Sequence, residues 1–364
     1  MKRFFFSYLT GAMLLAALLP DLSAQQKNCY DVNIGNPPDR FETLLKTEPE
    51  KWDFNFRRYG DESSVLVSDP ILQRNVQSGT ETTEQRLTAL YVAANNEGFD
   101  IIVFSAEHGI RDALSKGTAV PGNSLEIFFA PGDADTEKIE HYYQFITDME
   151  STKILDFPWL VETRNFRRLR DAVQCTTRKV SNGYVTRIHV PWEILYNKLP
   201  FQDKADNFWR LSVIRWAPGG GQTWGGVVHA ATTAGYIRFP HYTDEQKAEI
   251  QEYVLNRAWE KYRRDLATYG SALVMDMKEP YRKELPKRPR SFMNMQEDRV
   301  FVEKVLIPME KERNDLGAGI ASFSGMTPEE RDAFYGKAAD MLMNFDYDVQ
   351  EAYRTYLAER LFKN

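Results

Sequence analysis

The sequence predicts a mainly β protein: an antiparallel β-sandwich over residues 25–240, followed by an α-helical region over residues 241–364. Two observations lead to this prediction. Up to Pro240, short apolar or alternating runs recur between turn sequences such as NNEG and PGN, a spacing typical of antiparallel strands rather than of alternating strands and helices. After Pro240 the apolar residues recur at helical spacing, and helix-start signals appear.

The first 24 residues have the features of a secretory signal peptide. Lys2 and Arg3 precede an apolar run over 4–19, and the segment LSA at 22–24 is a small-residue cleavage site. A transmembrane anchor is the alternative reading, but the run is short for a span and contains polar residues. We therefore expect cleavage after residue 24 and a secreted or periplasmic protein with no membrane segment.

Charge and cysteine usage narrow the classes of partner. The formal net charge of −6 argues against nucleic acid or anionic lipid. The chain has two cysteines, Cys29 and Cys175, and export would place them where a disulfide can persist. They form either one disulfide or two buried thiols, and the sequence leaves both open. Their spacing excludes a zinc site built on cysteine.

Six segments of the first region are expected to be strands. In the fifth, alternation places Arg187 and His189 together on one polar face. Pro191 then begins a short helical turn that extends to Tyr196. The six segments are 87–94, 99–105, 125–130, 142–147, 184–190 and 209–216.

The helical region carries two clear start signals. Thr243 and Gln246 fit a capping box, and Thr327 starts a second one with Pro328 at the first helical position. A final amphipathic helix is expected over 347–362, and the proline-rich, basic stretch 278–290 is expected to be a linker or loop. The residues that can form one face of the first helix are Ile250, Val254, Trp259, Tyr262 and Leu266.

No catalytic residue is assigned. The sequence has no GxSxG, HExxH or Ser-x-x-Lys context for a nucleophile or a metal-dependent hydrolase. Glu126, Glu193, Asp148 and Asp156 could supply the two carboxylates of a glycoside hydrolase, but charged residues make up 27% of the chain, so carboxylates in this region are expected by chance.

The tryptophans point to a different chemistry. Trp192, Trp209, Trp216 and Trp224 fall within a short stretch that also holds arginines. Flat rings stack on the apolar face of a sugar, and arginine, glutamate and asparagine side chains bond its hydroxyls. Alternation assigns Trp209 to the core, whereas Trp216 ends a strand before a glycine-rich turn and Trp224 precedes two glycines.

Five segments in order resemble the family 9 carbohydrate-binding modules over roughly residues 30 to 240. They are NSLEIFFAPGD, HYYQFITD, NGYVTRIHVPWEIL, FWRLSVIRW and TWGGVVHAATTAGYIRF. The resemblance implies a β-sandwich that holds a sugar between two aromatic rings and often binds structural calcium. It matches Glu126, Arg215 and Trp224 to motif positions of the family. The chain departs from the family by lacking a tryptophan before Glu126 and by having Ser212 where asparagine is usual.

The sequence therefore predicts a non-catalytic, exported carbohydrate-binding protein that assists polysaccharide recognition or breakdown. Trp224 and Trp216 would stack on the sugar, and Arg215, Glu126 and Arg187 would bond its hydroxyls. By family analogy, Asp133 and Asp135 would ligate calcium.

Two alternatives of other classes stay open. One is a scaffold that has lost its sugar site and binds a protein partner through the helical region. The other is a haem-binding sandwich whose two axial ligands are a methionine and a histidine, or two histidines, with candidates in the methionines and in His108, His141, His189 and His229.

Overall fold

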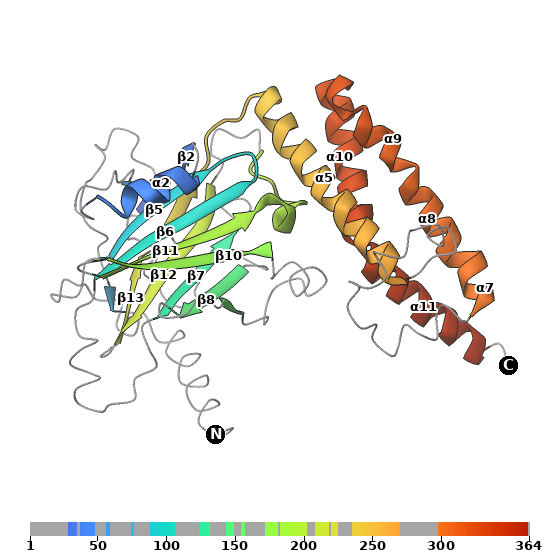
Figure 1. Ribbon diagram of the computed structural model, residues 1–364, viewed down its shortest axis with the longest axis horizontal. Coiled ribbons are helices and arrows are strands. Elements are labelled where there is room, and N and C mark those ends of the chain that lie inside the picture. The colour runs from blue at the N-terminus through green and yellow to red at the C-terminus, as the bar shows by residue number, and fades with distance from the viewer. Residues whose placement is uncertain are drawn as a thin grey trace.

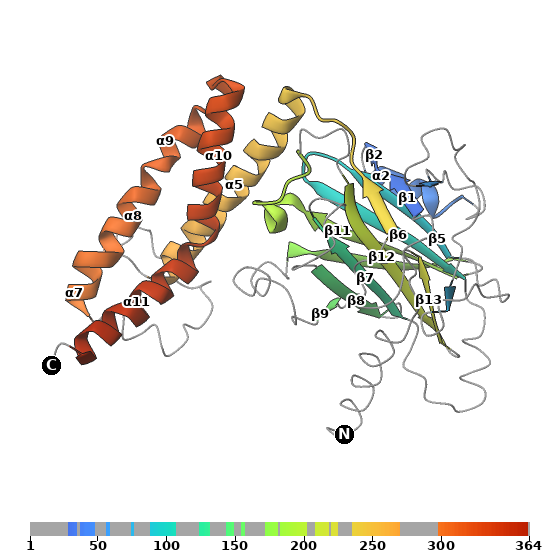
Figure 2. The ribbon, with the colours of Figure 1, turned by 180° about the vertical axis from the view of Figure 1, so that it is seen from behind.

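The computed structural model describes the following residues: 28–34, 37–47, 56–58, 74–75, 88–106, 124–131, 143–148, 154–156, 172–180, 183–201, 208–217, 220–224, 235–269 and 298–362. They form two β-sheets packed face to face and a group of helices beside them (Figures 1 and 2). None of the described helices is long and apolar enough to cross a membrane. The expected signal peptide lies outside the described residues.

The larger sheet has nine strands. Its main path runs β3-β1-β14-β12-β7-β8-β9, and β13 pairs with both β12 and β4. All pairs are antiparallel except β1 with β14. The strands are β1 (Asn28–Asp31), β3 (Phe56–Arg58), β4 (Arg74–Asn75), β7 (Ser124–Ala130), β8 (Tyr143–Asp148), β9 (Ile154–Asp156), β12 (Phe208–Ala217), β13 (Gly220–Trp224) and β14 (Gly235–Arg238).

The smaller sheet has five strands in the order β10-β11-β6-β5-β2. Here the pair of β2 with β5 is parallel and the other pairs are antiparallel. Helix α2 (Pro37–Leu44) packs on β6 and buries Phe41 and Leu44. The strands are β2 (Asn33–Ile34), β5 (Thr88–Ala94), β6 (Gly98–Ala106), β10 (Gln174–Val180) and β11 (Gly183–Pro191).

Aromatic rings fill the space between the two sheets. Phe99 of β6 lies with its ring centroid 5.3 Å from that of Phe129 and 5.8 Å from that of Trp209, which both belong to the larger sheet. Edge-to-face contacts of this kind add to the stability gained by burying the rings. Trp209 is buried, as the sequence predicts. Phe99 therefore marks the inward face of β6, and every second residue from it shares that face.

The helices follow the last strand. Their residues outnumber those of the described strands, so the prediction of a mainly β protein is not confirmed, while the sandwich is. The elements are α5 (Asp244–Tyr269), α7 (Arg299–Phe301), the π-helix η8 (Val302–Leu306), α8 (Ile307–Asn314), α9 (Leu316–Ala321), the 3-10 helix η9 (Phe323–Gly325), α10 (Pro328–Met343) and α11 (Phe345–Phe362).

Both predicted capping boxes are present. The Gln246 backbone N–H donates to Thr243 Oγ1 over 3.3 Å, and the Gln246 side chain accepts from the Thr243 N–H over 3.0 Å. Thr327 and Glu330 form the same reciprocal pair at the start of α10. These bonds satisfy N–H groups that the first turn of a helix leaves without partners.

A short 3-10 helix, η4 (Trp192–Leu195), joins the sandwich to the helices, as expected after Pro191. All four of its residues are buried, and α5 packs against it. Glu193 accepts from Arg257 Nε over 2.8 Å, and Tyr335 Oη donates to the backbone oxygen of Tyr196 over 2.6 Å. One continuous apolar core therefore extends from the sheets into the helices.

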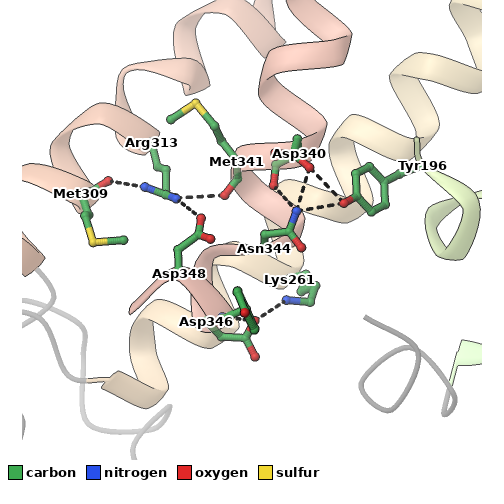
Figure 3. Close-up of polar contacts among 10 residues, drawn as sticks. Tyr196, Lys261, Met309, Arg313, Asp340, Met341, Asn344, Asp346 and Asp348 are labelled. Atoms are coloured by element: carbon green, nitrogen blue, oxygen red, sulfur yellow. Dashed lines mark hydrogen bonds and ion pairs between the residues drawn. The ribbon is translucent and has the colours of Figure 1, made fainter. Parts of the chain in front are cut away.

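Polar contacts complete this seam (Figure 3). The Tyr196 hydroxyl donates to Asp340 Oδ1 over 3.1 Å and accepts from Asn344 Nδ2 over 2.9 Å. Asn344 Nδ2 also lies 2.8 Å from Asp340 Oδ1. Because Tyr196 follows η4 of the sandwich, Asp340 lies in α10 and Asn344 in the turn between α10 and α11, the network connects the two parts.

Among the described residues, the helical group contains one buried acidic side chain whose oxygens have no hydrogen-bond partner. Glu310 of α8 is fully buried, and neither of its carboxyl oxygens has such a partner. Burial raises its pKa from 4.5 to about 7. Its neighbour Arg313 is bonded elsewhere, to Asp348 over 2.6 Å and to the backbone oxygen of Met341 over 2.9 Å (Figure 3).

Candidate functional site

Strand alternation divides β7 between the core and the opposite face. Leu125, Ile127 and Phe129 belong to the core cluster between the sheets. Glu126 and Phe128 do not, although they are only 6% and 8% exposed. Because successive residues of a strand point to opposite faces, Glu126 and Phe128 lie on the outward face of the nine-stranded sheet.

Strand β12 divides in the same way. Trp209, Leu211 and Val213 belong to the core cluster, so Arg210 and Ser212 lie on the outward face. The register places Arg210 opposite Tyr236 of β14, and Ser212 opposite Phe128 of β7. Directly opposed residues of an antiparallel pair share a face.

These residues form one row on the outward face, called the outward row below. It contains a carboxylate, a guanidinium and a hydroxyl, together with two aromatic rings. All five side chains are at most 8% exposed, so protein atoms cover most of their surface, and each already has an interaction partner. The sequence-based prediction included Glu126 but not Arg210 or Ser212. The signal for these two residues is that they alternate with core residues such as Trp209 along one strand. The row consists of Glu126, Phe128, Arg210, Ser212 and Tyr236.

The register separates the other predicted residues of this sheet. Trp216 follows Ile214 by two positions and lies opposite Ser124 and Gly221, so position 216 continues the outward row. Trp224 lies opposite Val213, a core residue, and Arg215 lies opposite Leu125, also a core residue. Positions 215 and 224 are therefore on the inward face, away from Glu126.

Arg187 lies on the other sheet. It belongs to β11, where His189 and Arg187 share the outward face of the five-stranded sheet, as alternation predicts. Asp100 of β6, opposite His189, is fully buried and forms an ion pair with Arg187 Nε. Its other oxygen lies 2.5 Å from His189 Nδ1. Sequence reasoning missed Asp100, whose signal is a single acidic residue inside the apolar run FDIIVFS.

The remaining candidate carboxylates and histidines lie at different points of the fold. Glu193 of η4 accepts a hydrogen bond from Arg257 at the seam. Asp148 ends β8 opposite Ser124, so position 148 shares the outward face with Glu126, whereas Asp156 of β9 lies opposite Phe145, on the inward face. Of the four histidines proposed as haem ligands, only His189 is described, and its Nδ1 is bonded to Asp100. His108, His141 and His229 lie outside the described residues.

The predicted calcium ligands Asp133 and Asp135 also lie outside the described residues. Within the described ranges, no group of three or more His, Cys, Asp or Glu side chains could hold a metal ion. Cys29 belongs to β1 and Cys175 to β10, on different sheets. The side chain of Cys29 is outside the described part, so the disulfide stays a prediction.

Comparisons with known proteins give one kind of match. No family model matches the sequence, and no curated protein matches it. Two solved structures match in fold, both of a family 9 carbohydrate-binding module from Caldicellulosiruptor kristjanssonii, one in complex with glucose and one with cellotriose. The glucose complex has a TM-score of 0.35 and 10% identity, covering 59% of this chain and 97% of the other. The cellotriose complex has a TM-score of 0.35 and 10% identity, covering 60% and 96%.

Proposed function

We propose that this protein binds carbohydrate without catalysing its breakdown, and that the outward row forms the floor of the binding surface. Sugar recognition requires hydrogen-bonding groups for the hydroxyls and aromatic rings for the apolar ring face. The outward row combines both, with Glu126, Arg210 and Ser212 beside Phe128 and Tyr236. The observation that supports the proposal is that these polar groups lie on the sheet face that does not form the sandwich core.

Trp216 is the stacking residue of this proposal. Its position continues the row by one step along β12, past Ile214, which lies opposite Glu126. A tryptophan there would meet the flat face of a sugar whose hydroxyls reach Glu126. Trp224 and Arg215 were predicted for the same site, but their register positions lie on the inward face. The proposal therefore assigns stacking to Trp216 rather than to Trp224.

The setting of this activity is proposed from the sequence. The basic start and apolar run of residues 1–24 support export to the periplasm or the medium, where polysaccharide is recognised or degraded. A calcium ion at Asp133 and Asp135 and a protein partner for the helical region belong to the same proposal. The acidic net charge of −6 supports a partner other than nucleic acid or membrane lipid.

Affinity electrophoresis of the complete chain in gels that contain soluble polysaccharides tests the proposal. We expect retardation by at least one glycan and a loss of about tenfold or more in affinity for Trp216→Ala, because each stacked ring contributes of the order of 1 kcal/mol beyond its buried area. Glu126→Gln should also weaken binding, since it removes a charge-assisted acceptor. Trp224→Ala is the matched control and should bind nearly as well as wild type.

Two results would count against the proposal. If no glycan retards the wild-type protein, carbohydrate binding is wrong. If Trp224→Ala abolishes binding while Trp216→Ala does not, the protein binds sugar through the inward-facing positions, and the outward row is the wrong site.

A further inference from the structure

Arg187 and His189 are held in place by one buried carboxylate on the outward face of the five-stranded sheet. Asp100 has no exposed surface and uses one oxygen for each partner: Oδ1 lies 2.5 Å from His189 Nδ1, and Oδ2 pairs with Arg187 Nε. A buried carboxylate that bonds to two side chains fixes the plane of the His189 ring and the plane of the Arg187 guanidinium. Neither group can rotate without removing a partner from the buried charge of Asp100.

The outer nitrogens of the Arg187 and His189 side chains are not used by Asp100. Asp100 binds only the inner nitrogens, and no described residue bonds to Nη1 or Nη2 of Arg187, or to Nε2 of His189. The side chains of Arg187 and His189 are 16% and 11% exposed, so their ends reach the surface. With Nε occupied, the guanidinium presents its Nη1–Nη2 edge, which matches the two oxygens of a carboxylate.

The histidine adds a second, different requirement. Because a carboxylate oxygen only accepts, Nδ1 carries the hydrogen of the contact with Asp100, and in the tautomer with hydrogen on Nδ1 alone Nε2 is an acceptor. An acceptor beside the guanidinium edge suits a hydroxyl group that lies next to a carboxylate on the same ligand. A ligand that carries a carboxylate without a neighbouring hydroxyl would bond to Arg187 but not to His189.

The surrounding strand supplies more hydrogen-bonding groups and positive charge. The register places Gln174 of β10 opposite His189, and Thr176 opposite Arg187, on the same face. Gln174 is exposed and Thr176 half-buried, and neither side chain bonds to a described residue. Arg178, also exposed, lies on this face two positions further along. Two arginines against the single Asp100 give this part of the face a positive field that favours an anion.

We propose that Arg187 and His189 form a binding site for an acidic sugar, that is, one whose ring carries a carboxylate beside a hydroxyl. Arg187 donates to the carboxylate through its Nη1–Nη2 edge, and His189 Nε2 accepts a hydrogen bond from the hydroxyl. This site is on the opposite sheet from the outward row, so it is independent of the site proposed for carbohydrate binding in general. It changes the role expected for Arg187 from bonding neutral hydroxyls to selecting a negatively charged residue of the glycan.

Isothermal titration calorimetry of the complete chain with D-glucuronate, D-glucose and acetate tests the proposal. We expect wild type to bind glucuronate at least about tenfold more tightly than either glucose or acetate, because only glucuronate offers both groups. Arg187→Lys keeps the positive charge that pairs with Asp100, so the variant should fold. It loses the two terminal N–H groups that bind a carboxylate together, so it should bind glucuronate about tenfold more weakly. Lys179→Gln removes a charge from the same strand but from its opposite face, and should change affinity about twofold or less.

A spectroscopic readout separates binding at this site from a purely structural ion pair. Glucuronate should shift the NMR signal of His189 Nε2, and glucose should not. The proposal is overturned if glucuronate and acetate bind equally, if Arg187→Lys binds glucuronate as wild type does, or if the His189 signal does not respond. Loss of neutral-glycan binding in Trp216→Ala, with glucuronate binding kept, would show that the two sites fail separately.

Discussion

The carboxyl group of Glu310 should make the stability of the helices depend on pH. Its pKa is about 7 in the folded protein, against 4.5 for an ordinary glutamate. Between these values the unfolded chain loses the proton while the folded chain keeps it, so the free energy of unfolding falls as pH rises from about 4.5 to about 7. A pKa difference of about 2.5 corresponds to about 3 kcal/mol as an upper value, since each pKa unit is worth about 1.4 kcal/mol.

The variant Glu310→Gln removes the ionisable group and keeps its size. Below about pH 4 the wild-type carboxyl is protonated in both states, so the two proteins should be nearly equal in stability. At pH 8 the variant should be more stable by about 2–3 kcal/mol, because the wild type must then bury a charge with no hydrogen-bond partner. Urea unfolding followed by far-ultraviolet circular dichroism, repeated across this pH range, measures the difference.

Glu312→Gln is the matched control, since Glu312 lies on the same helix and is exposed. It should show no such growth of the stability difference with pH. Hydrogen exchange of α8 peptides, corrected for the intrinsic pH dependence of exchange, should place the change at Ile307–Asn314. A stability difference between wild type and Glu310→Gln that stays constant from pH 4 to pH 8 would refute the reasoning.

Three further predictions concern single contacts, each measured as the free energy of unfolding in urea. Thr327→Ala should cost about 1 kcal/mol, because it removes the hydroxyl half of the capping box, and a loss of only a tenth of that would contradict the assignment. Gly98→Ala should cost more than about 2 kcal/mol, because the added Cβ would lie 2.4 Å from the backbone oxygen of Val190, whereas Gly336→Ala, with open space around it, should stabilise α10 by up to about 1 kcal/mol. Tyr335→Phe should cost about 1–2 kcal/mol by leaving the backbone oxygen of Tyr196 without its 2.6 Å donor, and an unchanged stability would show that water replaces the hydroxyl.

Most of the regular structure could be predicted because its signals are local. Alternating apolar residues located β6, β7, β11 and β12 to within a residue or two, and the threonine capping boxes located the starts of α5 and α10. Strand β10 was missed, since its sequence QCTTRKV has no apolar alternation and its edge position leaves it half exposed. Helices α7 to α9 were also missed, because charged residues interrupt their apolar spacing.

The candidate sites were less accessible to the same reasoning. Alternation along one strand correctly put Arg187 beside His189, but Asp100 comes from a neighbouring strand, and only the register brings it to them. Trp216 and Trp224 were grouped because they are close in the sequence. In the hairpin of β12 and β13, positions 216 and 224 lie on opposite faces of the sheet. The length of the turn sets this register, and composition does not reveal it.

The continuous core through η4 has a consequence for how this protein can be divided. A fragment that ended at residue 240 would expose Leu195 and Tyr196 to water, and would leave Glu193 without Arg257. Such a surface favours association with other molecules over folding alone. We therefore expect a fusion or truncation that treats the sandwich as an independent module to fail by aggregation rather than by loss of a ligand contact.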